Sequence, residues 1–402
     1  MVTFLSGMEG VSDKKHRVLL LILTISAVSV SCCQEPVIQA HSALLADGES
    51  GRVLWEKNPT DVCYPASLTK LMTALLAIEH RHPNELVTVP SDFRSPGGAS
   101  LGLKPKERLR LYDLVAALLL QSANDAAVVI AQHVGGSVPG FVRMMNQRAW
   151  TLGMIRTRFT NPHGLHDPRH FTTARDLLRL ARHAFFYQEL RELIATKERH
   201  IAATNLSPPR ILKNHNKLLW RYPYSDGVKT GFTNASGPCL IASATRDGWR
   251  LIAVILNSKD HYGDAQRLLD FGYRNFIRIR LAEAGTPLLR IPIPEGDGDG
   301  HLVAIASEGV ETVVSRKDAN RIRWLVYPFR LRPPIYQGQT VGIASLSVPG
   351  LPEQRIGLLA SRTVHFSLRA QIIRFFFVSI AALIVMAIVQ WIARRIIPSW
   401  RQ

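Results

Sequence analysis

The segment that decides the fold reads Tyr64-Pro65-Ala66-Ser67-Leu68-Thr69-Lys70-Leu71-Met72-Thr73-Ala74-Leu75. It predicts a largely apolar, central helix that continues through Ile78. Ser67 and Lys70 are three residues apart at the start of this helix, so they share one face and can touch. A desolvated lysine can take the proton of a serine hydroxyl and make it a nucleophile. The amides of the helix N-terminus favour the oxyanion that then develops.

The serine–lysine spacing also occurs by chance at Ser12 and Lys15, so other segments must support it. The tripeptide 122–124, Ser-Ala-Asn, precedes a predicted helix and can present a hydroxyl and an amide to a cleft. The tripeptide 229–231, Lys-Thr-Gly, lies on a predicted strand, where its glycine would let a ligand backbone approach closely. Together, in this order, the three motifs match the set of penicillin-binding proteins and β-lactamases.

On these motifs the chain resembles the serine-type D-alanyl-D-alanine carboxypeptidases, the low-molecular-mass penicillin-binding proteins. The resemblance spans roughly residues 36–362. Beyond the nucleophile segment, it is carried by residues 121–126, 152–154 with 159–165, 172–176 and 227–233. It implies a serine peptidase that trims peptidoglycan stem peptides ending in D-Ala-D-Ala and is acylated by β-lactam antibiotics. It implies no cofactor and no metal.

The same resemblance implies the roles of individual residues. Ser67 would be acylated by the penultimate D-alanine, Lys70 would be the base, and Ser122 would relay protons. Asn124 would hold the peptide bond of the substrate, and Lys229 would contribute positive potential beside Gly231. Thr230 with Arg250 would bind the terminal carboxylate of the substrate. The backbone amides of Ser67 and Phe232 would donate to the oxyanion that forms at the attacked carbonyl. The Arg250 assignment rests only on its place in the segment 247–252. Cys63 departs from the pattern.

Three other functions remain open. A class A β-lactamase deacylates with a glutamate between the second and third motifs, whereas residues 125–188 contain only the acids Asp125, Asp167 and Asp176. Slow release of penicillin is therefore expected. An endopeptidase that cuts peptidoglycan cross-links would use the same groups as a carboxypeptidase. A catalytically silent wall-binding protein is disfavoured by the intact motifs.

The predicted fold class is α/β of the α+β type, with an antiparallel sheet flanked by helices. A hairpin is expected over 42–47 and 52–56, helices over 111–120, 125–131 and 176–184, and strands over 228–232, 238–245 and 250–257. Short β segments rich in Pro and Gly then predict a small second domain. The expected divisions are a signal peptide (1–33), a catalytic domain (36–274), a β-rich domain (275–362) and a linker with anchor (363–402).

Two apolar segments predict an exported, membrane-anchored chain. Basic residues precede the run 18–30, and small residues follow it, which is the order of a secretory signal peptide. Lipidation at Cys32 or a buried helix is the alternative there. Near the other end, residues 375–392 are long enough to cross a bilayer, and Arg394 and Arg395 beyond them suit the cytoplasmic side. A buried or surface-lying helix is the alternative.

The net charge of +18 does not indicate a nucleic-acid partner, since no basic helix or aromatic patch concentrates it. An anionic wall or membrane surface is the expected partner. Cys63 and Cys239 could form a bridge in an oxidising compartment, which the sequence alone does not establish.

Three further patterns are interpreted as loops. Residues 98–102 fit the nucleophile elbow of α/β-hydrolases but lack its flanking strand and helix. The cluster His163, His166, Asp167 and His170 resembles a metal site but lies in a Pro- and Gly-containing loop. Residues 295–300 resemble the start of a calcium loop. Counted from Asp297, however, the sixth position, where such a loop requires glycine, is Leu302.

Overall fold

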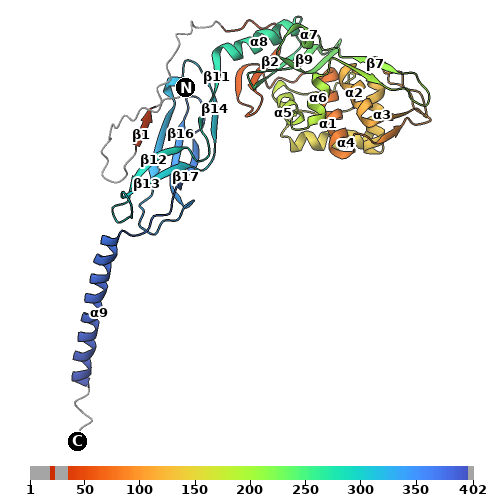
Figure 1. Ribbon diagram of the computed structural model, residues 1–402. Coiled ribbons are helices and arrows are strands. Elements are labelled where there is room, and N and C mark those ends of the chain that lie inside the picture. The colour runs from red at the N-terminus through yellow and green to blue at the C-terminus, as the bar shows by residue number, and fades with distance from the viewer. Residues whose placement is uncertain (1–18, 23–34, 397–402) are drawn as a thin grey trace. The chain divides into compact units, whose positions relative to one another are not determined.

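The structure is a computed structural model that describes residues 19–22 and 35–396 (Figure 1). The described residues divide into two compact units: residues 35–275 form one, and residues 276–396 together with 19–22 form the other.

The first unit is built on a five-stranded antiparallel sheet with the order β3-β2-β10-β9-β8. Its strands are β2 (Ser42–Asp47), β3 (Val53–Lys57), β8 (Ser225–Thr233), β9 (Gly237–Arg246) and β10 (Trp249–Leu256). All six residues of β2 are buried, so both faces of the sheet are covered. The predicted hairpin and the three later strands are confirmed.

Helices cover the two faces of this sheet (Figure 1). On one face lies α8 (His261–Asn275), which can pack closely because Gly272 has no side chain. A Cβ at Gly272 would lie 2.5 Å from the Leu251 side chain. On the other face, Leu44 and Val254 belong to a core shared with the helical cluster. Its helices are α1 (Lys70–His80), α2 (Leu111–Leu120), α3 (Asn124–Gly135), α4 (Val138–Thr151), α5 (Ala174–Ala184) and α6 (Gln188–Ala195).

Short elements complete this unit. A 3₁₀ turn, η1 (Ala66–Thr69), leads directly into α1. Two small antiparallel pairs and one short helix follow along the chain: β4 (Leu86–Thr88) with β5 (Arg108–Arg110), β6 (Glu198–Ile201) with β7 (Arg210–Lys213), and α7 (Leu218–Arg221).

The second unit is the small β-rich domain expected from the sequence. Its larger sheet has the order β1-β15-β16-β17-β13-β12, and β11 pairs with β14 separately. Trp324, Leu302 and Leu358 lie in its core. The elements are β11 (Phe276–Ala282), β12 (Pro287–Pro292), β13 (His301–Ala306), β14 (Val310–Ser315), η2 (Ala319–Arg321), β15 (Arg323–Pro328), β16 (Thr340–Ser347) and β17 (Gln354–Ala360).

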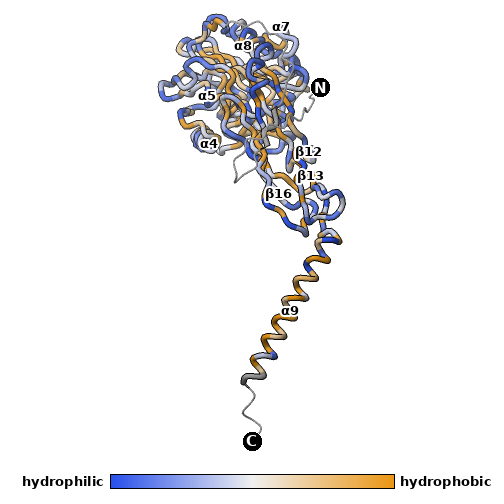
Figure 2. Tube along the Cα trace, turned by 90° about the vertical axis from the view of Figure 1, so that its left-hand side faces the viewer, coloured by the Kyte–Doolittle hydropathy of each residue, from blue (hydrophilic) through white to orange (hydrophobic). Residues whose placement is uncertain are grey.

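A long apolar helix, α9 (Leu368–Ile396), follows the β-rich domain. Its segment Leu368–Ala393 has a mean hydropathy of 2.7 over its most apolar stretch, and none of that stretch is buried (Figure 2). The helix is long and apolar enough to cross a bilayer. A helix whose most apolar stretch is not buried among the described residues is consistent with a membrane anchor.

Most of the predicted signal peptide lies outside the described residues. Its segment Leu19–Ile22 forms β1, an edge strand antiparallel to β15.

Candidate active site

The serine–lysine pair of the first motif is in contact. Lys70 Nζ lies 2.9 Å from Ser67 Oγ and donates to the backbone oxygen of His163 at 2.5 Å. Lys70 is completely buried at the start of α1. Burial and the nearby positive charge of Lys229 hold the pKa of Lys70 well below its usual value. The lowered pKa favours the neutral amine, which is the form that can accept the proton of Ser67.

A loop over residues 159–165 holds the amine of Lys70 from the other side. Gly164 has φ +86°, and a Cβ there would lie 1.8 Å from the Ala66 oxygen, so only glycine fits against η1. Thr73 Oγ1 donates to the Pro162 oxygen at 2.6 Å and ties the loop to α1. The His163 oxygen is thereby fixed against Lys70. The family resemblance includes this loop, but its contact with Lys70 was not predicted.

The third motif lies on β8, an edge strand packed against η1. A Cβ on Gly231 would lie 3.1 Å from both Ser67 N and the Pro65 oxygen. The expectation was that this glycine admits a ligand backbone; in the structure, the backbone that approaches it is the chain's own nucleophile turn. The absence of a side chain at Gly231 therefore brings the first and third motifs together.

Lys229 is almost completely buried, and its Nζ donates to the Thr230 oxygen at 3.0 Å. Burial lowers the pKa of Lys229 to about 7. The next residues along β8 are more accessible: Thr230 is half-buried, and Phe232 is 63% exposed. Together they line an open strand edge beside the nucleophile.

The second motif brings a strained serine and a fixed asparagine to the start of α3. Ser122 has φ +62°, a left-handed conformation that is uncommon for a residue with a side chain. Asn124 donates from Nδ2 to the Gly97 oxygen and from its backbone N to the Ala99 oxygen, both at 2.7 Å. Within the described residues no hydrogen bond joins Ser122 to Ser67 or Lys70.

Arg250 is not brought to Thr230. Thr230 pairs with Leu240, which pairs in turn with Ile255, whereas Arg250 is five residues before Ile255 on β10. At about 3.4 Å per residue, Arg250 lies about 17 Å along the sheet from Thr230. The guanidinium contacts Asp226 at 3.2 Å and covers the ring of Phe185. The expectation that Arg250 and Thr230 share one carboxylate is therefore wrong.

His215, an exposed residue that the motifs did not indicate, lies close to the second and third motifs. Its backbone N donates to the Leu120 oxygen, two residues before Ser122. Burial and the charge of Lys229 lower the pKa of the imidazole. The residue therefore lies between the second and third motifs, and its local sequence carries no pattern that would mark it.

The patterns interpreted as loops serve structural roles. Residues 98–102 form a loop, as expected, and pack against Asn124 and Asp125. No group of side chains suited to a metal occurs among the described residues. His170 accepts from Thr160 N and contacts Thr69 Oγ1, which fixes the loop beneath η1.

Cys63 and Cys239 are free thiols in the structure. Burial is the main cause that raises the pKa of Cys63 to about 11 and that of Cys239 to about 12.

Comparisons with known proteins agree with this geometry. The sequence profile of the D-alanyl-D-alanine carboxypeptidase family matches residues 29–260. The chain is 30% identical to the D-alanyl-D-alanine carboxypeptidase DacC of Escherichia coli, covering 83% of this chain and 86% of that protein. It is 29% identical to DacF of Bacillus subtilis, covering 78% of this chain and 82% of that protein.

Solved structures agree on the fold. Penicillin-binding protein 5 from Haemophilus influenzae superimposes with a TM-score of 0.67 at 28% identity, covering 83% of this chain and 99% of that one. The profile spans the residues that form the site, and the superposition includes both the antiparallel sheet with its helices and the β-rich domain. The chain belongs to the family of serine-type D-alanyl-D-alanine carboxypeptidases.

Proposed function

We propose that this chain removes the terminal D-alanine from peptidoglycan stem peptides through an acyl-enzyme on Ser67. The observation that carries the proposal is the 2.9 Å contact between Ser67 Oγ and the buried amine of Lys70. A lysine whose pKa is held low by burial and by a second cation can act as a general base near neutral pH.

In the first half-reaction, Ser67 Oγ attacks the carbonyl carbon of the penultimate D-alanine, and its proton passes to Lys70 Nζ. The amides of Ser67 and Phe232 would donate to the oxyanion. The C–N bond then breaks, and the proton reaches the leaving amine of the last D-alanine by way of Ser122. In the second half-reaction, water attacks the Ser67 ester and releases the shortened peptide.

The substrate would lie along the open edge of β8. Asn124 would accept from the peptide N–H, and Thr230 would donate to the terminal carboxylate beside the positive potential of Lys229. Arg250 has no part in this proposal. Burial lowers the pKa of Lys229 to about 7, so the charge that attracts an anionic substrate weakens above neutral pH.

We further propose that the catalytic domain (36–274) acts outside the cytoplasmic membrane. Residues 1–33 would be removed as a signal peptide, residues 363–402 with α9 would anchor the chain, and the β-rich domain (275–362) would separate the two. The length and hydropathy of α9 support the anchor.

The test uses the purified full-length chain and a pentapeptide ending in D-Ala-D-Ala. The wild type should release free D-alanine, and Ser67→Ala should release none. Labelled penicillin should leave a slowly released adduct on Ser67 that the same variant cannot form. Fast turnover of penicillin would instead favour a β-lactamase. Cleavage of cross-linked dimers with no release of D-alanine would favour an endopeptidase. No release and no adduct under any condition would favour a silent wall-binding protein.

A further inference from the structure

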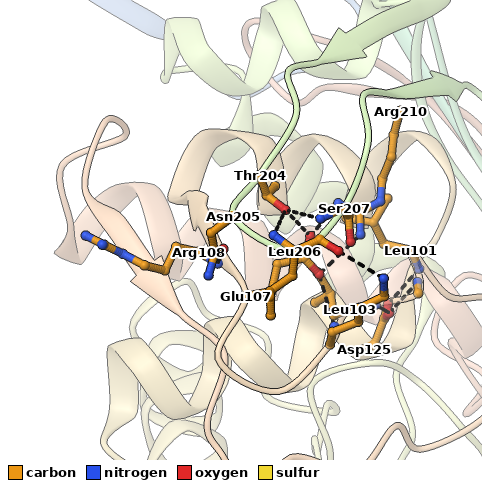
Figure 3. A network of polar contacts seen from close by, with 12 residues as sticks. Leu101, Leu103, Glu107, Arg108, Asp125, Thr204, Asn205, Leu206, Ser207 and Arg210 are labelled. Atoms are coloured by element: carbon orange, nitrogen blue, oxygen red, sulfur yellow. Dashed lines mark hydrogen bonds and ion pairs between the residues drawn. The ribbon is translucent and has the colours of Figure 1, made fainter.

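Asp125, next to the second motif, is a fully buried carboxylate that the proposed mechanism does not use. In the part of the chain that the structure describes, it makes no ion pair. Its donors from outside α3 all come from one short segment: the Ser100 hydroxyl at 2.6 Å and the backbone amides of Leu101, Gly102 and Leu103 at 2.9, 3.0 and 3.1 Å. Figure 3 shows Leu101 and Leu103 beside Asp125. The carboxylate thus holds a tight turn over the N-terminus of α3.

The turn belongs to a loop that also contacts Asn124. Gly97 and Ala99 precede the segment that Asp125 holds, and both contact Asn124. The Gly97 oxygen accepts from Asn124 Nδ2, and the Ala99 oxygen accepts from Asn124 N. A Cβ on Gly98 would lie 2.8 Å from Asn124 Nδ2, so the loop backbone presses directly on the amide. Two consecutive residues of α3 therefore grip the loop 97–103, hereafter the clamp loop.

The contact with Gly97 decides which way the Asn124 amide faces. A carbonyl oxygen can only accept, so the nitrogen of the amide must point at Gly97 and the oxygen must point away from it. Asn124 Oδ1 then remains as the acceptor for a peptide N–H. If the clamp loop moved, the amide would lose the partner that fixes this orientation.

We propose that Asp125 is a positioning residue for the reaction: by holding the clamp loop it orients the Asn124 amide toward the substrate. This inference rests on the proposed function. It also gives the segment 98–102, which resembles a nucleophile elbow in sequence, a different role. Its Ser100 hydroxyl donates to Asp125 and is no nucleophile.

The first variant is Asp125→Asn in the full-length chain. It keeps the size of the side chain but replaces one oxygen with a donor, which opposes the donors that face Asp125 Oδ2. Loss of orientation at a substrate contact predicts about 30-fold lower kcat/KM for D-alanine release. Asp264→Asn is the matched control. Asp264 is equally buried in the first turn of α8 and accepts from the Ser258 hydroxyl and two backbone amides; unlike Asp125, it also pairs with Arg267 at 2.5 Å. It should alter the melting temperature but keep kcat/KM within about twofold.

The decisive measurement is a double-mutant cycle with Asn124→Ala. If Asp125 acts through Asn124, then Asp125→Asn should cost less than about threefold once the amide is gone. An equal loss in both backgrounds, or no loss in either, would overturn the proposal. If Asp125→Asn does not fold, Ser100→Ala, which removes one donor from an exposed position, supports the same cycle with an expected loss of about fivefold.

The cycle is also run on the rate of Ser67 acylation by labelled penicillin, which likewise presents an amide beside its reacting carbonyl. A wild type that is acylated but releases no D-alanine would refute the proposed function and leave the cycle interpretable. A wild type with both activities but an additive cycle would refute only the positioning role.

Discussion

The packing of β8 against the nucleophile turn predicts the effect of a single methyl group. Gly231→Ala would place a Cβ 3.1 Å from Ser67 N and from the Pro65 oxygen, and 3.2 Å from Ala66 Cβ. Ordinary contacts of this kind begin near 3.4 Å, so η1 must move by about 0.2–0.3 Å. That turn carries both the nucleophile and a proposed oxyanion donor.

A misplacement of 1 Å costs about 100-fold in rate, so this displacement predicts about 2.5-fold to fourfold slower acylation of Ser67. Overpacking should also destabilise the chain by about 1 kcal/mol, which lowers the melting temperature by about 3 °C. The assay is the second-order rate of labelling by fluorescent penicillin at several drug concentrations, beside a thermal melt.

Gly309→Ala is the matched control, because a Cβ there meets nothing closer than 3.7 Å. It should change neither the rate nor the melting temperature. A Gly231→Ala chain that acylates at the wild-type rate would refute the reasoning, since β8 would then not press on Ser67.

Three further predictions follow from charges and from the anchor. Folding lowers the pKa of Lys229 from 10.5 to about 7, so between pH 7 and pH 10.5 unfolding takes up a proton. The free energy of unfolding therefore rises with pH in this range. Lys229→Met should flatten this rise by about 1.4 kcal/mol per pH unit in urea titrations. Glu107 is fully buried and pairs with Arg210 at 2.8 Å (Figure 3), so Glu107→Ala should cost about 3 kcal/mol in the same titrations near pH 7; an unchanged midpoint would contradict this. A chain that ends at residue 366 should appear in the soluble fraction with full acylation activity, whereas retention in the membrane would exclude α9 as the sole anchor.

The sequence predicted the elements whose pattern is long and regular. The helix 111–120 and the strands of the central sheet agree with the structure within a few residues. The pairs β4–β5 and β6–β7 could not be predicted, because strands of three or four residues carry too little periodicity. The helix α8 was missed for another reason: its buried stripe recurs at helical spacing, but Asp264 and Gly272 occupy two of its positions, so the apolar pattern is incomplete in the sequence.

The motifs identified the chemical groups of the site but not all their partners. Ser67 and Lys70 could be paired from local spacing alone. The partner of Lys70 on its other side is the backbone oxygen of His163, and a backbone atom leaves no mark in a sequence. The predicted place of Arg250 was wrong because the register across three strands decides which residues lie beside Thr230, and that register is set by tertiary packing.

The pairing of β2 with β10 has a consequence for how the chain folds. Leu45 lies opposite Ala253, 208 residues later, so the centre of the sheet joins the first and last parts of the catalytic unit. A chain that emerges N-terminus first can pair β2 with β3 but must leave the other edge of this fully buried strand open until β10 arrives, and such non-local pairing is slow and prone to aggregation. Any chain truncated before Trp249 leaves β2 without its partner, an edge open to other chains. Acylation of Ser67, which needs β8 in place beside η1, therefore reports that the whole unit has closed.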